Sequence, residues 1–405
     1  MALRVFLLLT LLLECNHPSE GSTIKQEPPS SEKSMCAPLE TSKSTNILHL
    51  GNGANLGVLL MEFHWPSLTS SLSSFDFRTY DSEGIIFHGE IDGPGSWFLL
   101  ALRQRRLEIQ MSNEHGQMMI SQLGPNISDG KWRRVSIDRN ETIIEIRLDG
   151  ILLLDLYHTS ADSSNNTWLT IALGGLIPNS TVQLLSPLQF ALDGCIRNWS
   201  WVETEVHTLN NAMEINEHRR CFEHEKEGSY FPGSGYAQFE VPVFLINEDD
   251  PKDATPWGLR VEVSFRPVLA TGVLFAVQGQ NTMAFSFAMD SHKKAFTITL
   301  FDKQFSKHFP DDFCVGNWQS AKLKLLNSHL TLNTPIINAT WNIHLNDFKA
   351  LKSVWNKSTT TFYIGGIPES SYFTGCLEIF LQGKRVDLDL AMNKHEHIRT
   401  HSCPI

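Results

Sequence analysis

The sequence has no surplus of basic residues. Lys and Arg number 33 against 44 Asp and Glu, which gives a formal net charge of −11 over 405 residues. A protein that holds a phosphate backbone needs a positive field, so nucleic-acid binding is excluded as a leading function. With 26 glycines and 18 prolines, the sequence also lacks the bias of a collagen-like or proline-rich chain.

Apolar runs long enough to cross a membrane are missing as well. The N-terminal run Val5–Leu13 has nine residues, whereas a transmembrane helix needs about 20. Arg4 precedes this run, and the small residues Ser19 and Gly21 follow it. This order is typical of a secretory signal peptide. We therefore predict a signal peptide over residues 1–21 and a secreted, extracellular protein without a membrane span.

A secreted chain can be N-glycosylated at Asn-x-Ser/Thr triplets, because its acceptor asparagines meet the glycosylation machinery. Seven such triplets occur. The predicted glycosylation sites are Asn126, Asn140, Asn165, Asn179, Asn198, Asn338 and Asn356.

The seven cysteines include no Cys-x-x-Cys pair, which excludes a zinc-finger type of site. In an oxidising compartment cysteines tend to pair, and two pairs close loops of similar length, 26 and 27 residues apart. Each such loop would add about 3 kcal/mol of stability in the chain-entropy model. The predicted disulfides are Cys195–Cys221 and Cys376–Cys403. Cys15 lies in the predicted signal peptide. Cys36 and Cys314 are then either joined or free, and both alternatives stay open.

An internal repeat runs through most of the chain. Landmarks of the first half recur in the same order in the second half, at shifts of 181 to 191 residues. Such self-similarity indicates two copies of one domain. The recurring pairs are Phe77-Arg78 with Phe265-Arg266, Gly130-Lys131-Trp132 with Gly316-Asn317-Trp318, Gly174-Gly175 with Gly365-Gly366, and Gly194-Cys195 with Gly375-Cys376.

Within each copy, apolar residues alternate with polar ones, as in Leu107, Ile109 and Met111. This period of two predicts strands, and Asp149-Gly150 predicts a tight hairpin turn. Many short strands per copy indicate an all-β fold of two antiparallel β-sandwiches. One helical stretch is expected at Thr208–Arg219.

The predicted domain organisation follows from the repeat and from composition. Residues 22–45 are rich in Ser, Thr, Lys, Glu and Pro, which predicts a mobile polar tail. The first sandwich is expected over residues 46–222 and the second over residues 223–405. The charged stretch His224–Gly228 is predicted to link them.

Motifs for catalysis are absent or incomplete. The glycines of Gly51–Gly57 have the wrong spacing for a dinucleotide loop, and neither a Gly-x-Ser-x-Gly elbow nor a phosphate-loop lysine motif occurs. His397 and His401 are four residues apart, but Ile398 stands where a zinc protease needs Glu. Together with His395 they stay open as a metal-binding alternative. We therefore expect a binding protein and not an enzyme.

Several segments, in order and spacing, resemble the sex hormone-binding globulin family. The resemblance implies tandem laminin G-like β-sandwiches of the jelly-roll type and a carrier of sex steroids, androgens and estradiol, with its pocket between the two sheets of the first domain. The matching segments are Ser71–Phe87, Trp97-Phe98, Ile171–Leu176, Ala191–Cys195 and Thr400–Pro404.

The resemblance also implies the steroid-binding residues. Ser73 falls where the family bonds the oxygen of the steroid A ring, and Asn113 where it contacts the D-ring hydroxyl. Ser96 replaces the family's second D-ring anchor, an Asp, and hydrogen bonds to charged groups are the stronger ones; we therefore expect altered discrimination at that end. The pocket walls would be Phe87, Phe98, Ile137, Ile171 and Val202, with Arg139 and Leu169 in the places of two family methionines.

Calcium is implied as a structural cofactor, because Asp81 and Glu83 match the family's carboxylate ligands and hard cations prefer oxygen. The family's zinc site is not implied, since Glu114 and Ser96 stand where that site uses His and Asp. A homodimer through the first domain is implied too.

The alternative function is protein recognition. Vitamin K-dependent protein S and related ligands also carry paired laminin G-like domains, and such a ligand would bind a receptor or matrix protein and have no steroid site. Those chains place Gla, EGF or membrane segments around the pair. Here the sequence shows a predicted signal peptide and a short tail, which favours the steroid carrier.

Overall fold

The computed structural model describes residues 39–51, 56–64, 72–91, 95–112, 116–139, 143–157, 168–201, 209, 213, 216–241, 257–280, 282–311, 313–368 and 370–405. These residues form antiparallel β-sheets and an α-helix, α2 (Leu345–Trp355). The all-β prediction is confirmed. The predicted signal peptide, Cys36, Asn113, Glu114, Val202, Asn140 and Asn165 lie outside the described residues, as does the side chain of Arg139.

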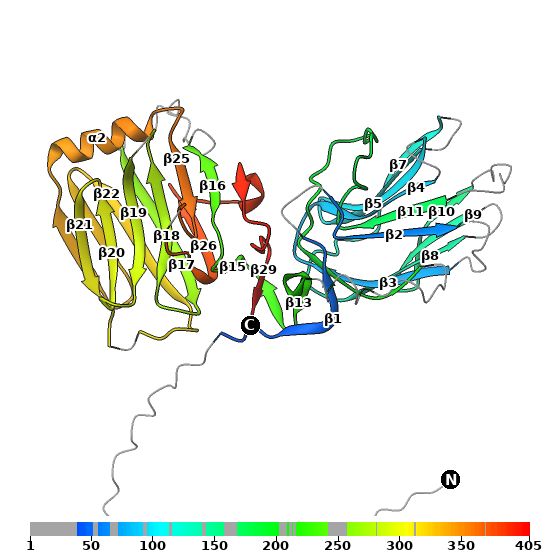
Figure 1. The fold of residues 1–405 in the computed structure, drawn as a ribbon, viewed down its shortest axis with the longest axis horizontal. Coiled ribbons are helices and arrows are strands. Elements are labelled where there is room, and N and C mark those ends of the chain that lie inside the picture. The colour runs from blue at the N-terminus through cyan, green and yellow to red at the C-terminus, as the bar shows by residue number, and fades with distance from the viewer. Residues whose placement is uncertain are drawn as a thin grey trace, which may run out of the picture. The chain divides into compact units, whose positions relative to one another are not determined.

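The first sandwich consists of two sheets that face each other (Figure 1). Sheet I has the spatial order β10 (Ile151–Tyr157), β9 (Ile143–Leu148), β8 (Arg133–Arg139), β3 (Leu72–Thr79), β12 (Gly194–Ser200), β1 (Lys43–His49) and β13 (Arg220–Phe222). Sheet II has the order β2 (Leu59–His64), β11 (Trp168–Leu173), β4 (Gly84–Ile91), β5 (Ser96–Arg103), β6 (Arg106–Ser112) and β7 (Met118–Leu123).

The second sandwich repeats this arrangement. Sheet III has the order β15 (Tyr230–Pro232), β26 (Thr374–Leu381), β17 (Gly258–Pro267), β22 (Gln319–Leu326), β23 (His329–Asn333) and β24 (Asn338–Asn342), with β27 (Lys384–Arg385) paired to β26. Sheet IV has the order β21 (Lys303–His308), β20 (Ala295–Leu300), β19 (Met283–Asp290), β18 (Gly272–Gln278), β25 (Thr361–Ile364), β16 (Ala237–Glu240) and β28 (Asn393–Lys394).

Local sequence signals explain much of this folding. Asp149 and Gly150 both have positive φ, 49° and 81°, as a two-residue hairpin turn requires, and they join β9 to β10 as predicted. Gly174 and Gly365, the repeated glycines, have φ of 73° and 79°. A Cβ at Gly174 would also meet the carbonyl oxygen of Leu50 at 2.5 Å, so both shape and conformation require glycine there.

The core of the first sandwich lies between sheets I and II, and a segment at 176–190 covers the outer face of sheet II. Leu188 packs there against Trp97 and Leu99. His88 of β4 is completely buried under this segment, and its Nδ1 accepts a hydrogen bond from the Ile177 backbone N–H at 3.2 Å. Sheet II is therefore buried on both faces around His88.

The second core is rich in phenylalanine, and α2 contributes Leu351 and Trp355 to it. Figure 1 shows α2 across one end of the strands of this sandwich. The helix begins after His344, whose side chain accepts from the Asn346 N–H. α2 was not expected from the sequence, because strand periodicity dominates on either side of it, although Phe348, Leu351 and Trp355 follow helical spacing.

Both predicted disulfides, Cys195–Cys221 and Cys376–Cys403, are present. Cys314 is disulfide-bonded as well, so it is not free. Cys36, its potential partner, lies outside the described residues.

Three segments differ from the expectations. β1 begins at Lys43, and Leu39 is buried beside Phe222 and Tyr230, so the expected polar tail ends earlier than residue 45. Glu217–Arg219, the end of the expected helix, forms a 3-10 turn, η2, and most of the remaining stretch lies outside the described residues.

The expected linker His224–Gly228 is a strand rather than a free connection. It contains β14 (Glu225–Glu227), which pairs with β29 (Ser402–Pro404). The buried carboxylate of Glu225 lies 2.9 Å from Nε of Arg78 in β3. A charged side chain is buried here because it has an ionic partner from the first sandwich.

Candidate functional site

The inner faces of sheets I and II bring together the described residues that the resemblance assigns to a ligand. Ser73 is buried in β3 and shares its face with Phe75 and Phe77, because residues two apart in a strand point the same way. Phe87, Ile137, Leu169 and Ile171 belong to or pack against the same core, and Phe98 packs there from β5. By alternation with Phe98, the half-buried Ser96 lies on the same face of β5.

A β-bulge in β12 adds two tryptophans to this space. Arg197 pairs with Asp76 and Ser200 with Ser74, so three steps along β12 oppose two along β3. Asn198 takes a positive φ of 50° at the bulge. The extra residue shifts the alternation, so that Trp199 and Trp201 both turn into the core.

The rings between the sheets form a connected cluster. Trp199 and Trp201 stack with centroids 5.3 Å apart and planes 9° apart. Trp199 lies 5.2 Å from Phe75, and Trp201 lies parallel to Phe98 at 6.3 Å. Phe87 meets both tryptophans edge-on, at 6.2 and 5.2 Å. The cluster can stack on a flat apolar ligand, as aromatic faces do.

Gly89 makes room for one of these rings. It pairs with Phe98 across β4 and β5, and a Cβ at Gly89 would lie 2.3 Å from the Phe98 ring. Because Gly89 has no side chain, the Phe98 ring can lie directly against its backbone.

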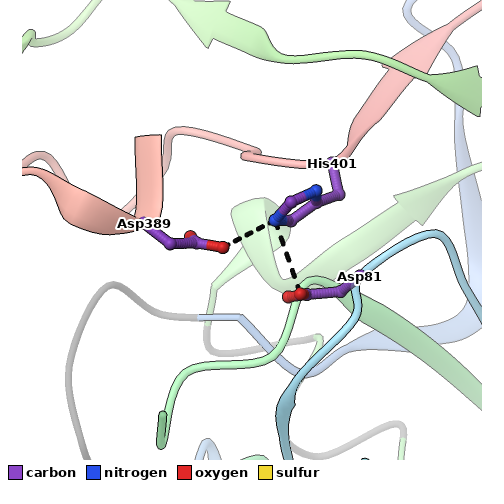
Figure 2. A group of neighbouring side chains, drawn as sticks. All are labelled: Asp81, Asp389 and His401. Atoms are coloured by element: carbon purple, nitrogen blue, oxygen red, sulfur yellow. Dashed lines mark hydrogen bonds and ion pairs between the residues drawn. The ribbon is translucent and has the colours of Figure 1, made fainter. Parts of the chain in front are cut away.

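A second group of side chains comes together from segments far apart in the chain: Asp81 from the β3–β4 turn, Asp389 from the 3-10 turn η4 (Leu388–Leu390), and His401 from just before β29. Figure 2 shows the carboxylates of Asp81 and Asp389 close to the imidazole of His401. His401 Nε2 lies 2.6 Å from Asp389 Oδ2 and 3.4 Å from Asp81 Oδ1. Burial alone would lower the pKa of His401, but the hydrogen bond to Asp389 and the charge of Asp81 raise it to about 9.

These three residues can hold a metal ion, since one ligand atom from each lies within 4.8 Å of the others. Two carboxylates fit a hard cation, and an imidazole nitrogen with carboxylates also suits zinc-type metals. Glu83 points to other partners: its Oε1 accepts from the Gln189 N–H at 3.0 Å and lies 3.8 Å from Arg103. The possible metal ligands beside Asp81 are thus Asp389 and His401. The spacing of these residues in the sequence does not indicate that they lie together.

The other two C-terminal histidines have different neighbours. His397 stacks on His218 with centroids 3.9 Å apart, and His395 lies edge-on to His397 at 5.0 Å. Among the described residues, His401 is the histidine of the three that joins a possible metal-binding group.

Five predicted glycosylation sites are described, and all five asparagines are exposed: Asn126, Asn179, Asn198, Asn338 and Asn356. Exposure is what an acceptor asparagine needs, and glycosylation itself stays a prediction.

Comparisons with known proteins identify the family of the chain. The laminin G domain family matches residues 77–207. Domains LG4-5 of the mouse laminin alpha1 chain superpose with a TM-score of 0.60 at 15% identity, over 94% of this chain and 100% of that one. The two sandwiches therefore define a tandem laminin G-like protein.

The sequence comparisons are more specific. Sex hormone-binding globulin of Phodopus sungorus is 30% identical over 377 residues, which covers 91% of this chain and 89% of that protein. The chain belongs to the sex hormone-binding globulin family. Vitamin K-dependent protein S of Oryctolagus cuniculus is also similar, 29% identical over 388 residues, but the chain spans 59% of its length. For growth arrest-specific protein 6 of Mus musculus the corresponding share is 58%.

No helix in the described part of the chain is both long and apolar enough to span a membrane.

Proposed function

We propose that this protein is a secreted, glycosylated, non-enzymatic carrier of sex steroids, with the ligand between sheets I and II. The observation that carries the proposal is the buried hydroxyl of Ser73 on an inner face that otherwise carries apolar rings. A flat apolar ligand needs apolar walls and a polar group at its end. Membership of a family named for hormone binding supports the same function.

Steroid titration with Ser73→Ala beside the wild type tests this proposal. We expect saturable binding of tritiated androgens and estradiol to the wild type. Loss of one neutral hydrogen bond should weaken binding about fivefold in the variant. Ser74→Ala is the matched control, because the Ser74 hydroxyl accepts from Arg134 at 2.7 Å on the opposite face and should leave affinity unchanged.

Absence of saturable binding to the wild type would refute the steroid carrier. It would favour the second candidate, a recognition ligand for a receptor or matrix protein of the protein S type. The observation that favours this candidate is the contact between Phe98 and Trp201. Their rings pack against each other in the space between the sheets where a steroid would lie.

A dimer through the first sandwich is part of the proposal. β7 is the last strand of sheet II, and it exposes Met118 and Ile120. Apolar side chains on an unpaired edge strand support pairing with a second copy.

We propose in addition that calcium binds at Asp81 with Asp389 as a second carboxylate, and that Glu83 joins after releasing Gln189. A cation at 100 times its dissociation constant stabilises a protein by about 2.7 kcal/mol. Chelation should therefore lower the melting temperature by about 5–10 °C. Differential scanning calorimetry of the full chain, with and without EDTA, measures this.

Two variants identify the ligands of the cation. Asp389→Asn should abolish most of the chelation effect, and Glu83→Gln should reduce it. Readdition of Ca²⁺ or Zn²⁺ separates the two metals. An unchanged melting temperature on chelation would show that the cation proposal is wrong.

A further inference from the structure

The indole N–H of Trp199 is a buried donor with no acceptor among the described residues. Its Nε1 is inaccessible to solvent and makes no hydrogen bond to them. A buried Trp N–H usually has a partner, and a polar group without one is costly. This N–H therefore marks a place where an acceptor is missing from the intersheet cluster.

The surroundings of Trp199 hold its ring in one place. Trp201 stacks on the ring at 5.3 Å, Phe75 packs on it at 5.2 Å, and Phe87 meets it edge-on at 6.2 Å. Asn198, the preceding residue, points outward, and its amide donates to Asp76 at 2.7 Å. At the bulge, Asn198 thus makes a polar contact on the outer face, and the next residue, Trp199, places its ring on the inner face.

The strand register locates Trp199 relative to Ser73. Ser200 pairs with Ser74, so Trp201 lies beside Ser73 and Trp199 lies beside Phe75. Two residues along a strand correspond to about 6.6 Å. A steroid whose A-ring oxygen meets Ser73 would therefore present its middle rings at the level of Trp199.

We propose that the Trp199 N–H donates a hydrogen bond to an oxygen on the C ring of the bound steroid, and that this chain selects C-ring-oxygenated steroids. The inference rests on the proposed steroid function and adds a specificity-determining residue to it. A ketone fits best, since Trp can only donate. Ser73 then orients the end of the ligand, and Trp199 distinguishes ligands that differ in the middle.

Equilibrium binding of testosterone and its 11-keto analogue to the full chain tests this. We expect the wild type to bind the 11-keto analogue about fivefold more tightly, the effect of one neutral hydrogen bond. Trp199→Phe should remove that preference and change testosterone affinity by less than about twofold. Trp97→Phe is the control: Trp97 packs against Leu188 on the outer face of sheet II, so its replacement should leave the preference for the 11-keto analogue unchanged.

A measurement on the wild type alone guards against a variant that does not fold. In a 15N-labelled wild-type sample, one indole N–H signal should shift downfield with the 11-keto analogue and not with testosterone. Equal affinities of the wild type for both steroids, or a preference that survives in the variant, would overturn the proposal. If neither steroid binds, the proposed function itself fails, which is a different outcome.

Discussion

Replacing Asp193 with Ala is expected to destabilise the protein by about 3–5 kcal/mol, the usual cost of breaking a buried, hydrogen-bonded charge cluster. The buried Asp193 carboxylate lies 2.8 Å from His49 Nε2. It also accepts from the His401 N–H at 2.8 Å and from the Ser402 N–H and hydroxyl at 3.1 and 2.9 Å. Truncation leaves these donors buried and unpaired.

The free energy of unfolding in urea, followed by circular dichroism, measures this loss. Asp129→Ala is the matched control: its carboxylate pairs with Arg133 at 2.8 Å but is about one third exposed, so it should cost less than about 1 kcal/mol. Equal losses in the two variants would contradict the role of Asp193. Since His49 belongs to β1 and Ser402 to β29, the same carboxylate joins the first sandwich to the C-terminal strand.

The second large effect is a loss of stability in acid that depends on His88. Burial lowers the pKa of His88 to about 4, whereas an unfolded histidine titrates near 6.5. Between these two pKa values, the unfolded chain therefore binds a proton at His88 that the folded chain does not bind. The stability associated with neutral His88 is complete above pH 6.5 and falls as the pH drops toward 4, by about 3 kcal/mol in all.

Unfolding free energies at pH 4, 5, 6 and 7 for the wild type and His88→Asn test this. The difference between the two proteins should change by about 3 kcal/mol across that range, in favour of the wild type at the higher pH. His308→Asn, at an exposed position of β21, controls for the general effect of replacing a histidine by asparagine. A constant difference for His88→Asn would refute the assignment.

Much of the fold was predictable because its signals are local. The alternation around Ile109 and Ile146 needs only neighbouring residues, and Asp149-Gly150 encodes its own turn. The two disulfides were predictable because two cysteine pairs close loops of similar length, 26 and 27 residues apart.

The candidate site was predictable in part. Alternation along β3 is enough to put Ser73 and Phe75 on one face. The inward turn of Trp199 was not predictable, because a single positive φ at Asn198 reverses the alternation after it. The sequence Trp-Ser-Trp at 199–201 was the one available signal, since two large rings at spacing two indicate a shared face.

By itself, then, the sequence determined the class of protein: two similar all-β sandwiches with paired cysteines and one set of apolar faces in each. The tertiary structure alone decided which distant charges meet. Asp81 and His401 are 320 residues apart, and their approach to 3.4 Å depends on β29 pairing with β14. The spacing of apolar residues predicts which face of a sheet a side chain lies on. Contact between distant segments depends instead on how whole sheets and the segments between them pack.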